Sequence, residues 1–230
     1  MKLTWSPERA SKAYIDTVTA CKTYKESGVP ELVSAMAAGW NAQLILETWA
    51  LGNPIFTSIG LTVSRRHTAG RHVCVVPDED SRSEYIKMVE GTVGAATEVL
   101  IFGEAIEEVM ERLEGIEFMV VDCRLEDFCK LLKMARLGDR GAVLVCKNAS
   151  SRNLSGFRWG AVLEGRRPSQ VQRRLVRSVF LPVGKGLDIA EVGKAAVGSR
   201  VSIMNPARRS SSGSRDEYYY RLAIILVLVP

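Results

Sequence analysis

The segment LILETWALGNPIFTSIGLTVSRR, residues 44–66, decides how the chain is expected to fold. It begins as an apolar run, passes through a Gly-Asn-Pro turn at residues 52–54, and resumes as an apolar helix. Many α/β enzymes begin with such a strand, loop and helix, and they hold a nucleotide-like ligand in that loop. This loop lacks the GxGxxG sequence, so it is either an altered cofactor loop or only a connector.

Apolar runs continue along the chain and alternate with segments that suit helices. The runs are QLILET (Gln43–Thr48), HVCVVP (His72–Pro77), EVLIFG (Glu98–Gly103), EFMVVDC (Glu117–Cys123) and AVLVCKN (Ala142–Asn148). Runs without polar alternation are typical of strands buried on both faces of a parallel sheet. Helices are expected between them, at Ile59–Arg66, Ser83–Glu90, Ala105–Leu113 and Leu125–Arg136. Five successive units of this kind predict a doubly wound α/β domain.

The two ends of this series carry different signals. Ser6-Pro7-Glu8 is a good helix start, so helices are expected at Pro7–Tyr24 and Pro30–Ala38. Near the other end, strands Val176–Val183 and Leu187–Val192 flank a Gly-Lys-Gly turn. So short a link permits only an antiparallel hairpin, and the sheet is therefore expected to be mostly parallel with an antiparallel end.

The remaining organisation follows from composition. A helix is expected at Pro168–Val176, one domain at residues 1–204 and a tail at residues 205–230. The tail is polar and then apolar, and its run Leu222–Val229 could add an edge strand, bind a partner or be a sticky terminus. No window reaches the roughly 20 apolar residues that span a bilayer, and no signal peptide is recognisable. An intracellular protein, cytoplasmic or nuclear, is expected.

Cysteine and charge patterns narrow the classes further. The five cysteines are scattered without CxxC spacing, so reduced thiols are expected rather than disulfides or a zinc site. The net charge is +5, but the segment Lys147–Lys185 alone carries nine basic residues and one acid. Such a segment could attract an acidic acceptor, phosphate or nucleic acid, and the alternative is a solvated arginine-rich surface.

The order of these segments resembles the class I S-adenosylmethionine-dependent methyltransferases, particularly the caffeoyl-CoA and catechol O-methyltransferases. LILET and its loop resemble the "strand-E-x-G" cofactor segment, and EVLIFGEAIEEVMERL resembles "strand-G-D-A". EFMVVDCRLEDFCKLL resembles "FDFVFVDADKxxYxxY", LGDRGAVLVCKN resembles "LxxGGxxxxDN", and VFLPVGKGLDIA resembles "LPxGDGLxIA". The resemblance implies a Rossmann-like methyltransferase fold with N-terminal helices and S-adenosylmethionine as cofactor.

Other stretches resemble a plant family of uncharacterised proteins in the same superfamily, described as a domain of unknown function. They are SPERASKAYIDTV, AAGWNAQLI, GRHVCVVPDEDSRSEY and FLPVGKGLDI. This resemblance implies the same fold, and it brings no established reaction.

The resemblance places the cofactor contacts on eight residues: Glu47, Gly52, Ser58, Asp78, Glu79, Gly103, Glu104 and Asp122. An acid after the second strand, Asp78 or Glu79, would bind the ribose hydroxyls, although the same position serves NAD in dinucleotide folds. Each assignment has a structural alternative. Glu47 could be a surface carboxylate at a strand end, and Glu104 a first-turn acid that favours the helix dipole.

A divalent metal is not expected. In the metal-dependent O-methyltransferases the aspartate matching Asp122 is a magnesium ligand, together with the aspartate and asparagine of "DN". Here Lys147 replaces the second carboxylate and Arg124 replaces another acid. Magnesium prefers several hard oxygen ligands, and two added cations oppose it. Asp122 is expected to pair with Lys147 or Arg124.

Two residue types offer further candidates. His67 and His72 could form a base or metal pair, but turn histidines without a cluster of acids or cysteines are more often polar surface. Among the four tryptophans, Trp49 just after the first strand is the best candidate for a ligand-facing role, although large aromatics are core residues first.

Two functions are compatible with this sequence. The first is a methyltransferase-like protein that binds S-adenosylmethionine and transfers a methyl group, without a metal, to a small or acidic acceptor. The second is a non-catalytic protein of the same fold that serves as a binding or regulatory module. A nicotinamide-dependent dehydrogenase fits less well, because GxGxxG is missing and the sheet ends in a hairpin.

Overall fold

The structure is a computed structural model that describes residues 4–22, 28–93, 97–103, 106–151, 157–164 and 175–193. All of these residues belong to one compact unit, Met1–Ala195. The expected tail at residues 205–230 lies outside the described residues, as does most of the expected helix Pro168–Val176. The last two residues of that helix prediction are wrong, because they belong to a strand.

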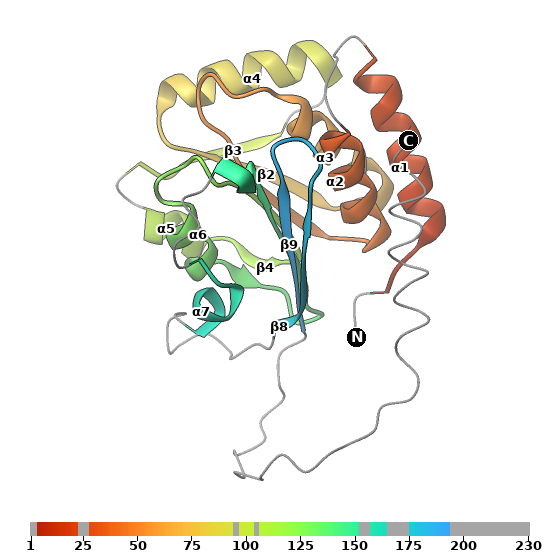
Figure 1. Cartoon of the computed structure of the whole chain (residues 1–230). Coiled ribbons are helices and arrows are strands. Elements are labelled where there is room, and N and C mark those ends of the chain that lie inside the picture. The colour runs from red at the N-terminus through yellow and green to blue at the C-terminus, as the bar shows by residue number, and fades with distance from the viewer. Residues whose placement is uncertain are drawn as a thin grey trace, which may run out of the picture. The chain divides into compact units, whose positions relative to one another are not determined.

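A seven-stranded sheet forms the centre of this unit, in the order β3-β2-β1-β5-β7-β9-β8 (Figure 1). Its strands are β1 (Leu44–Thr48), β2 (Arg71–Val76), β3 (Glu98–Ile101), β5 (Phe118–Asp122), β7 (Ala142–Lys147), β8 (Leu175–Leu181) and β9 (Leu187–Val192). The first five strands in this order are parallel, and β9 runs antiparallel to both of its neighbours. The mostly parallel α/β fold with an antiparallel hairpin at its end is therefore confirmed.

Helices cover both faces of the sheet. They are α1 (Pro7–Ala20), α2 (Val29–Gly39), α3 (Phe56–Thr68), α4 (Glu79–Val93), α5 (Ile106–Glu111), α6 (Phe128–Met134) and α7 (Trp159–Glu164), with a short 3₁₀ turn η1 (Ala149–Ser151). Helices α1 to α4 lie on one side, and α5, α6 and α7 lie on the other (Figure 1). The sequence missed α7 and extended the helix containing α6 to Arg136. That residue instead begins β6 (Arg136–Leu137), which pairs with β4 (Glu114–Ile116) in a separate two-stranded sheet.

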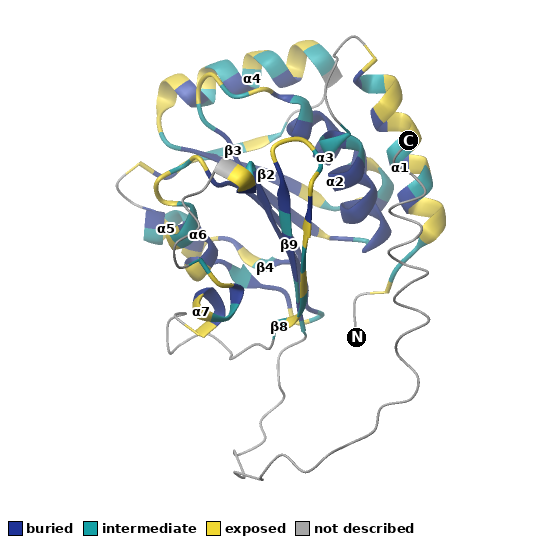
Figure 2. Cartoon of the chain, in the orientation of Figure 1, coloured by how far each residue is buried: buried dark blue, intermediate teal, exposed yellow. Residues whose placement is uncertain are grey.

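The apolar runs are explained by burial on both faces. Every residue of β1, β5 and β7 is buried (Figure 2). On the side of α5 to α7, residues such as Met119 and Leu131 form the larger apolar core. On the other side, Trp49, Ile59 and Tyr85 belong to a second core under α3 and α4. A strand covered twice has no solvent-facing positions, and its sequence therefore shows no polar alternation.

The expected start of the first helix is also confirmed. The Ser6 hydroxyl accepts a hydrogen bond from the Arg9 backbone N–H at 3.4 Å, and Pro7 is the first helical residue. Where α2 and α3 pack together, a Cβ on Gly60 would lie only 2.5 Å from the Pro30 carbonyl oxygen. Glycine at position 60 therefore allows the close approach of these two helices.

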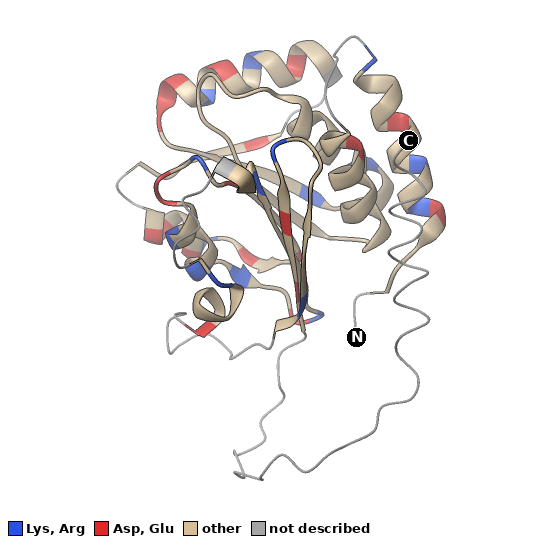
Figure 3. Cartoon of the chain, in the orientation of Figure 1, with Lys and Arg blue, Asp and Glu red and all other residues tan. Residues whose placement is uncertain are grey.

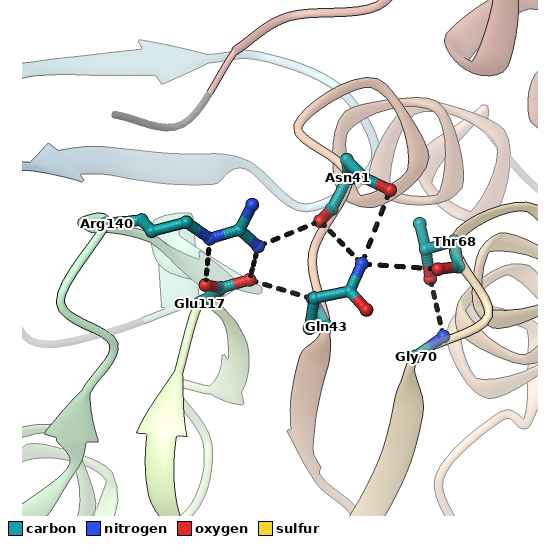
Figure 4. A network of polar contacts seen from close by, with 6 residues as sticks. All are labelled: Asn41, Gln43, Thr68, Gly70, Glu117 and Arg140. Atoms are coloured by element: carbon teal, nitrogen blue, oxygen red, sulfur yellow. Dashed lines mark hydrogen bonds and ion pairs between the residues drawn. The ribbon is translucent and has the colours of Figure 1, made fainter. Parts of the chain in front are cut away.

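A polar network joins the loops at the amino ends of the central strands (Figure 4). Both guanidinium nitrogens of Arg140 that face Glu117 donate to its carboxylate, with Nε to Oε1 at 2.6 Å and Nη2 to Oε2. Glu117 Oε2 also accepts from the Gln43 backbone N–H at 2.8 Å, and Arg140 Nη2 donates to the Asn41 carbonyl. The Glu117 side chain is only 8% exposed, so this carboxylate is a buried joint between three segments.

Replacing Glu117 with glutamine is expected to lower the free energy of unfolding by about 2 kcal/mol, because Arg140 loses a charged partner in a largely buried site. Urea unfolding measures the effect. The matched control is Glu114→Gln, because Glu114 also pairs with an arginine, Arg136, but its side chain is 70% exposed. The control should change stability by no more than about 0.5 kcal/mol. Equal losses in both variants would contradict the assigned role of the network.

Candidate functional site

The strand order identifies where a ligand would bind in this sheet. The chain runs outward in one direction from β1 to β2 and β3, and in the other direction from β5 to β7, so the order reverses between β1 and β5. Ligands of open α/β sheets bind outside the carboxyl ends of the strands at such a reversal. We call the loops and strand ends here, after β1, β2, β3, β5 and β7, the carboxyl edge.

Glu47 lies one residue before the end of β1, but its side chain points under the helices. It is fully buried and accepts hydrogen bonds from Tyr85 Oη at 2.6 Å and Ser58 Oγ at 3.0 Å. His72 Nε2 lies 3.0 Å from Oε1 of Glu47. The Thr62 hydroxyl contacts the other ring nitrogen of His72 at 3.3 Å. We call Glu47, Ser58, Tyr85, His72 and Thr62 the buried polar network.

Burial and the neighbouring polar groups have opposite effects on the pKa of Glu47 in this network. Burial raises the pKa of Glu47, but contact with His72, the positive charge of Lys147 and the hydrogen bond from Tyr85 bring it below its ordinary value. Burial raises the pKa of Tyr85 well above its usual range, and the neighbouring Cys74 and Glu47 raise it further. The tyrosine therefore stays a neutral hydrogen-bond donor to an ionised carboxylate.

These positions correct two expectations from the sequence. Glu47 is not a surface carboxylate, because it is fully buried and its oxygens accept hydrogen bonds from Ser58 and Tyr85 beneath α3 and α4. The histidines do not form a pair. His72 is buried in β2 within the network, whereas His67 on α3 lies 2.8 Å from the carboxylate of Asp16. Neither histidine is bare polar surface.

Asp122 ends β5, beside the reversal point, and its carboxylate is surrounded by donors. Arg124 donates to it three times, from its backbone N–H at 3.0 Å, from Nε at 3.1 Å and from Nη2 at 2.7 Å. Asn148 Nδ2 donates at 2.9 Å. The expected pairing of Asp122 with Arg124 is therefore confirmed. The Asp122 side chain is fully buried, whereas that of Arg124 is 38% exposed.

The charge of Asp122 is set by these neighbours. Burial raises the pKa of Asp122, but the Arg124 hydrogen bonds, the Lys147 charge and the Asn148 amide together hold it below its ordinary value. Lys147 is itself buried at the end of β7, with Asp122 as its register partner on the neighbouring strand. The ion pair with Asp122 also raises the pKa of Arg124. Both side chains therefore stay charged.

The loop after β1 is tied to the end of β5. Arg124 Nη2 donates to Asn53 Oδ1 at 2.7 Å, although 71 residues separate them in sequence. Nearby, the Leu51 backbone N–H donates to Ser81 Oγ at 3.2 Å, which links the same loop to the start of α4. Gly52 between them has a φ of 81°, and a Cβ there would meet no atom within 4 Å. The backbone at Gly52 is therefore open to approach.

Asp78 lies between β2 and α4, directly before the first residue of the helix. Its Oδ1 accepts from the Ser81 backbone N–H at 2.7 Å, and the bonds to Ser81 hold the pKa of Asp78 below its ordinary value. Asp78 is exposed to solvent. Glu79, one residue further, is 62% exposed and pairs with Arg82 on α4. Gly103, after β3, has a φ of 43°. Glu104 lies outside the described residues.

The tryptophans belong to packing. Trp49 is fully buried, and its ring packs edge-on against Tyr85 with 5.5 Å between ring centroids. Trp5 and Trp40 pack against each other, and Trp159 Nε1 donates to Asp188 Oδ1 at 2.8 Å. The expectation that Trp49 faces a ligand is therefore wrong, because its side chain turns into the core under α3.

The contacts that Tyr85, Ser81 and Asn53 make could not be read directly from the sequence. Tyr85 lies in the expected helix Ser83–Glu90, and Ser81 lies two residues before it. Their spacing of four residues is the one local sign that both side chains take the same face of a helix. Within the described ranges there is no group of three or more histidine, cysteine or acidic residues able to hold a metal ion. No helix among these residues is long and apolar enough to cross a membrane. Their cysteines are all free thiols.

Solved structures share this fold. A methyltransferase from Geobacter sulfurreducens is 17% identical, with a TM-score of 0.50 over 78% of this chain and 88% of its own. A methyltransferase from Podospora anserina, solved with SAH bound, is 13% identical, with a TM-score of 0.51 over 84% of this chain and 90% of its own. At these identities the likeness concerns the fold, which is that of the methyltransferases.

Sequence comparison gives the family. No curated protein matches this sequence significantly. The model of a family described as "Protein of unknown function (DUF1442)" matches residues 1–210. Because this match spans most of the 230 residues, the chain belongs to the DUF1442 family.

Proposed function

We propose that this protein binds S-adenosylmethionine, or a related adenosine nucleoside, at the carboxyl edge and transfers its methyl group without a metal. The observation that carries this proposal is the position of Asp78. Its exposed carboxylate stands just after β2, the strand beside β1 on one side of the reversal point. In doubly wound folds this is where an acid receives the two hydroxyls of a ribose.

The neighbouring residues fit a nucleoside beside Asp78. Gly52 and Gly103 both have positive φ, and the open space around Gly52 lets a ligand contact the backbone directly. Asp78, Gly52 and Gly103 come from the loops after β2, β1 and β3, which are adjacent in the sheet. Of the eight residues expected to contact the cofactor, these three suit that role. Glu79 points along α4, and Glu47 and Ser58 support the loop from below.

The chemistry would need little acid-base machinery from the protein. The bound sulfonium supplies an activated methyl group, so the chain has to bind the two reactants, orient them and exclude water. A small or acidic acceptor is proposed, on the side of β5 and β7. Asp122 would not coordinate a metal there, because its carboxylate already accepts four hydrogen bonds. The plant origin and intracellular location expected from the sequence stay predictions.

Replacing Asp78 with asparagine is expected to weaken binding of S-adenosylmethionine and SAH at least tenfold, as measured by titration calorimetry. The loss corresponds to one or more charge-assisted hydrogen bonds, about 1.5–3 kcal/mol each. Asparagine caps helices as well as aspartate does, so α4 should keep its start. Glu79→Gln is the matched control and should bind as the wild type does, because Glu79 is exposed and paired with Arg82.

The result also separates nucleoside classes. Binding of S-adenosylmethionine and SAH but not NAD supports the proposal, and binding of NAD alone would support a dehydrogenase. A wild-type protein that binds none of the three would refute the proposal. If the wild type binds S-adenosylmethionine and Asp78→Asn binds it equally well, the nucleoside does not bind at the end of β2.

The second candidate, a non-catalytic binding module, has one observation in its favour. The bond from Arg124 to Asn53 crosses the reversal point between β1 and β5, where a ligand would sit. Nucleic acid is a less favoured partner of such a module. Five of the nine basic residues in the segment Lys147–Lys185 lie outside the described residues. Of the other four, Lys147 is buried, Arg177 pairs with Glu191, and Arg158 and Lys185 are exposed. On α1 and α4, charges of both signs are interspersed (Figure 3).

A further inference from the structure

We propose that Arg124 is the residue that binds and orients the methyl acceptor, through an ionised oxygen of that acceptor held by its guanidinium Nη1. The inference rests on the proposed function and specifies the acceptor class for the same site. The ligand chemistry is an oxyanion, namely a carboxylate, a phenolate or a phosphate on a small molecule.

The hydrogen-bond inventory of Arg124 supports this role. Its guanidinium has five N–H donors. Nε and one Nη2 proton are used by Asp122, and the other Nη2 proton is used by Asn53. Nη1 has no acceptor among the described residues, and the side chain is 38% exposed. Two directed donors are therefore left for a ligand.

The guanidinium is held rigidly before any ligand arrives. Asp122 is fully buried and binds the group from below in a two-point contact, while Asn53 fixes it from the loop after β1. Asn148, from the end of β7, holds the carboxylate in turn, and its φ of 57° places it at the sharp exit from that strand. Donors fixed in advance bind an anion with less ordering cost than a free surface arginine does.

The position of Arg124 suits an acceptor rather than the nucleoside. Arg124 follows β5 and Asn53 follows β1, so their contact lies at the reversal point itself. Asp78 follows β2, on the other side of β1. An anion on Nη1 would therefore lie across the reversal point from the ribose, which is the arrangement that transfer between two reactants requires.

The charge balance sets the size of the effect. Asp122 neutralises most of the Arg124 charge, and Lys147 adds a buried positive charge that acts on both Asp122 and Glu47. The preference for an anion therefore comes from the two directed donors more than from net charge. Losing such a contact corresponds to about tenfold in affinity.

Binding of three probe anions tests the proposal: benzoate, 4-nitrophenolate and inorganic phosphate, each titrated into the full chain with and without saturating SAH. We expect at least one to bind the wild type and to bind Arg124→Gln about tenfold more weakly. The probe that binds distinguishes carboxylate, phenolate and phosphate acceptors. Arg136→Gln is the matched control, because Arg136 is 39% exposed and also paired with a carboxylate, Glu114. It should bind the anions as the wild type does.

Arg124→Gln leaves Asp122 without its charged partner, and this could unfold the protein. Two further variants keep the test decisive, with thermal unfolding as the check of folding. Arg124→Lys keeps a cation for Asp122 but loses the planar set of guanidinium N–H donors, so it should bind anions more weakly than the wild type. The double variant Asp122→Asn with Arg124→Gln removes both charges together and should bind anions as poorly as the single variant.

The outcomes separate this inference from the proposed function. Suppose that SAH binds. If the anions then bind the wild type and Arg124→Gln equally well, or bind neither protein, the inference about Arg124 is wrong and the nucleoside site stands. If SAH does not bind but Arg124→Gln still weakens anion binding, Arg124 is an anion site and the methyltransferase proposal fails. If Arg124→Gln and Arg136→Gln weaken anion binding equally, the effect comes from general surface charge and the inference about Arg124 is wrong.

Discussion

Replacing Glu47 with glutamine is expected to lower the free energy of unfolding by about 3 kcal/mol. The carboxylate is fully buried, and its loss takes the charged acceptor from Tyr85 and Ser58 and the compensating charge from Lys147. Breaking a buried charge network by removing one partner typically costs about 3–5 kcal/mol, and the amide of glutamine recovers part of it. Urea unfolding at neutral pH measures the change.

A surface pair gives the control for this prediction. Glu98 is paired with Arg71 at the sheet edge, with side chains 45% and 60% exposed. Glu98→Gln should change stability by less than about 1 kcal/mol. In a double-mutant cycle, Glu47→Gln and Tyr85→Phe should be coupled by at least about 0.5 kcal/mol, because the two groups are bonded at 2.6 Å. Additive effects would contradict the network.

The pH dependence of stability provides a second readout. The pKa of Glu47 in the folded protein lies below its ordinary value, so the folded state binds this proton less readily than the unfolded state. The stabilisation is complete above the unfolded pKa and is lost as the pH falls through the folded pKa. The stability difference between wild type and Glu47→Gln should therefore shrink under acidic conditions. A difference that grows on acidification would refute the lowered pKa.

The strands could be predicted because burial on both faces marks each of them locally. The boundaries of β9 agree with the sequence prediction, and β1 and β7 differ from it by one residue. The apolar composition of a twice-covered strand is visible in a window of five or six residues. In contrast, β4 and β6 have only three and two residues, too few to show any periodicity, and the sequence missed both.

The candidate site was less predictable because its contacts join distant segments. Position along a strand suggested that Glu47 and Asp122 lie near the carboxyl edge, but position alone does not say which face a side chain takes. Glu47 meets Tyr85 38 residues later, and Arg124 reaches back 71 residues to Asn53. The sequence places His72 at the start of a strand beside a turn, where a polar surface position is expected, whereas its ring is buried and contacts the Thr62 hydroxyl of α3. Such pairings depend on helix packing, which a single sequence does not specify.

Replacing Trp49 with alanine is expected to lower the free energy of unfolding by about 3–5 kcal/mol, the usual range for deleting a buried tryptophan ring. Trp49 is fully buried and packs edge-on against Tyr85 within the core under α3 and α4. Trp49→Phe should cost less, because it keeps an aromatic ring beside Tyr85. It also sacrifices no hydrogen bond, since the indole Nε1 has no partner among the described residues.

The phenylalanine variant also decides between packing and ligand contact for this residue. If Trp49 serves only the core, Trp49→Phe should bind SAH with wild-type affinity in calorimetry while losing stability in urea. A tryptophan stacked on an adenine contributes about 1–3 kcal/mol, so loss of such a contact would weaken binding about fivefold or more. A core role predicts lower stability with unchanged SAH affinity, whereas a ligand-facing role predicts lower SAH affinity with unchanged stability. Weakened SAH binding without loss of stability would therefore restore the ligand-facing role that the burial of Trp49 contradicts.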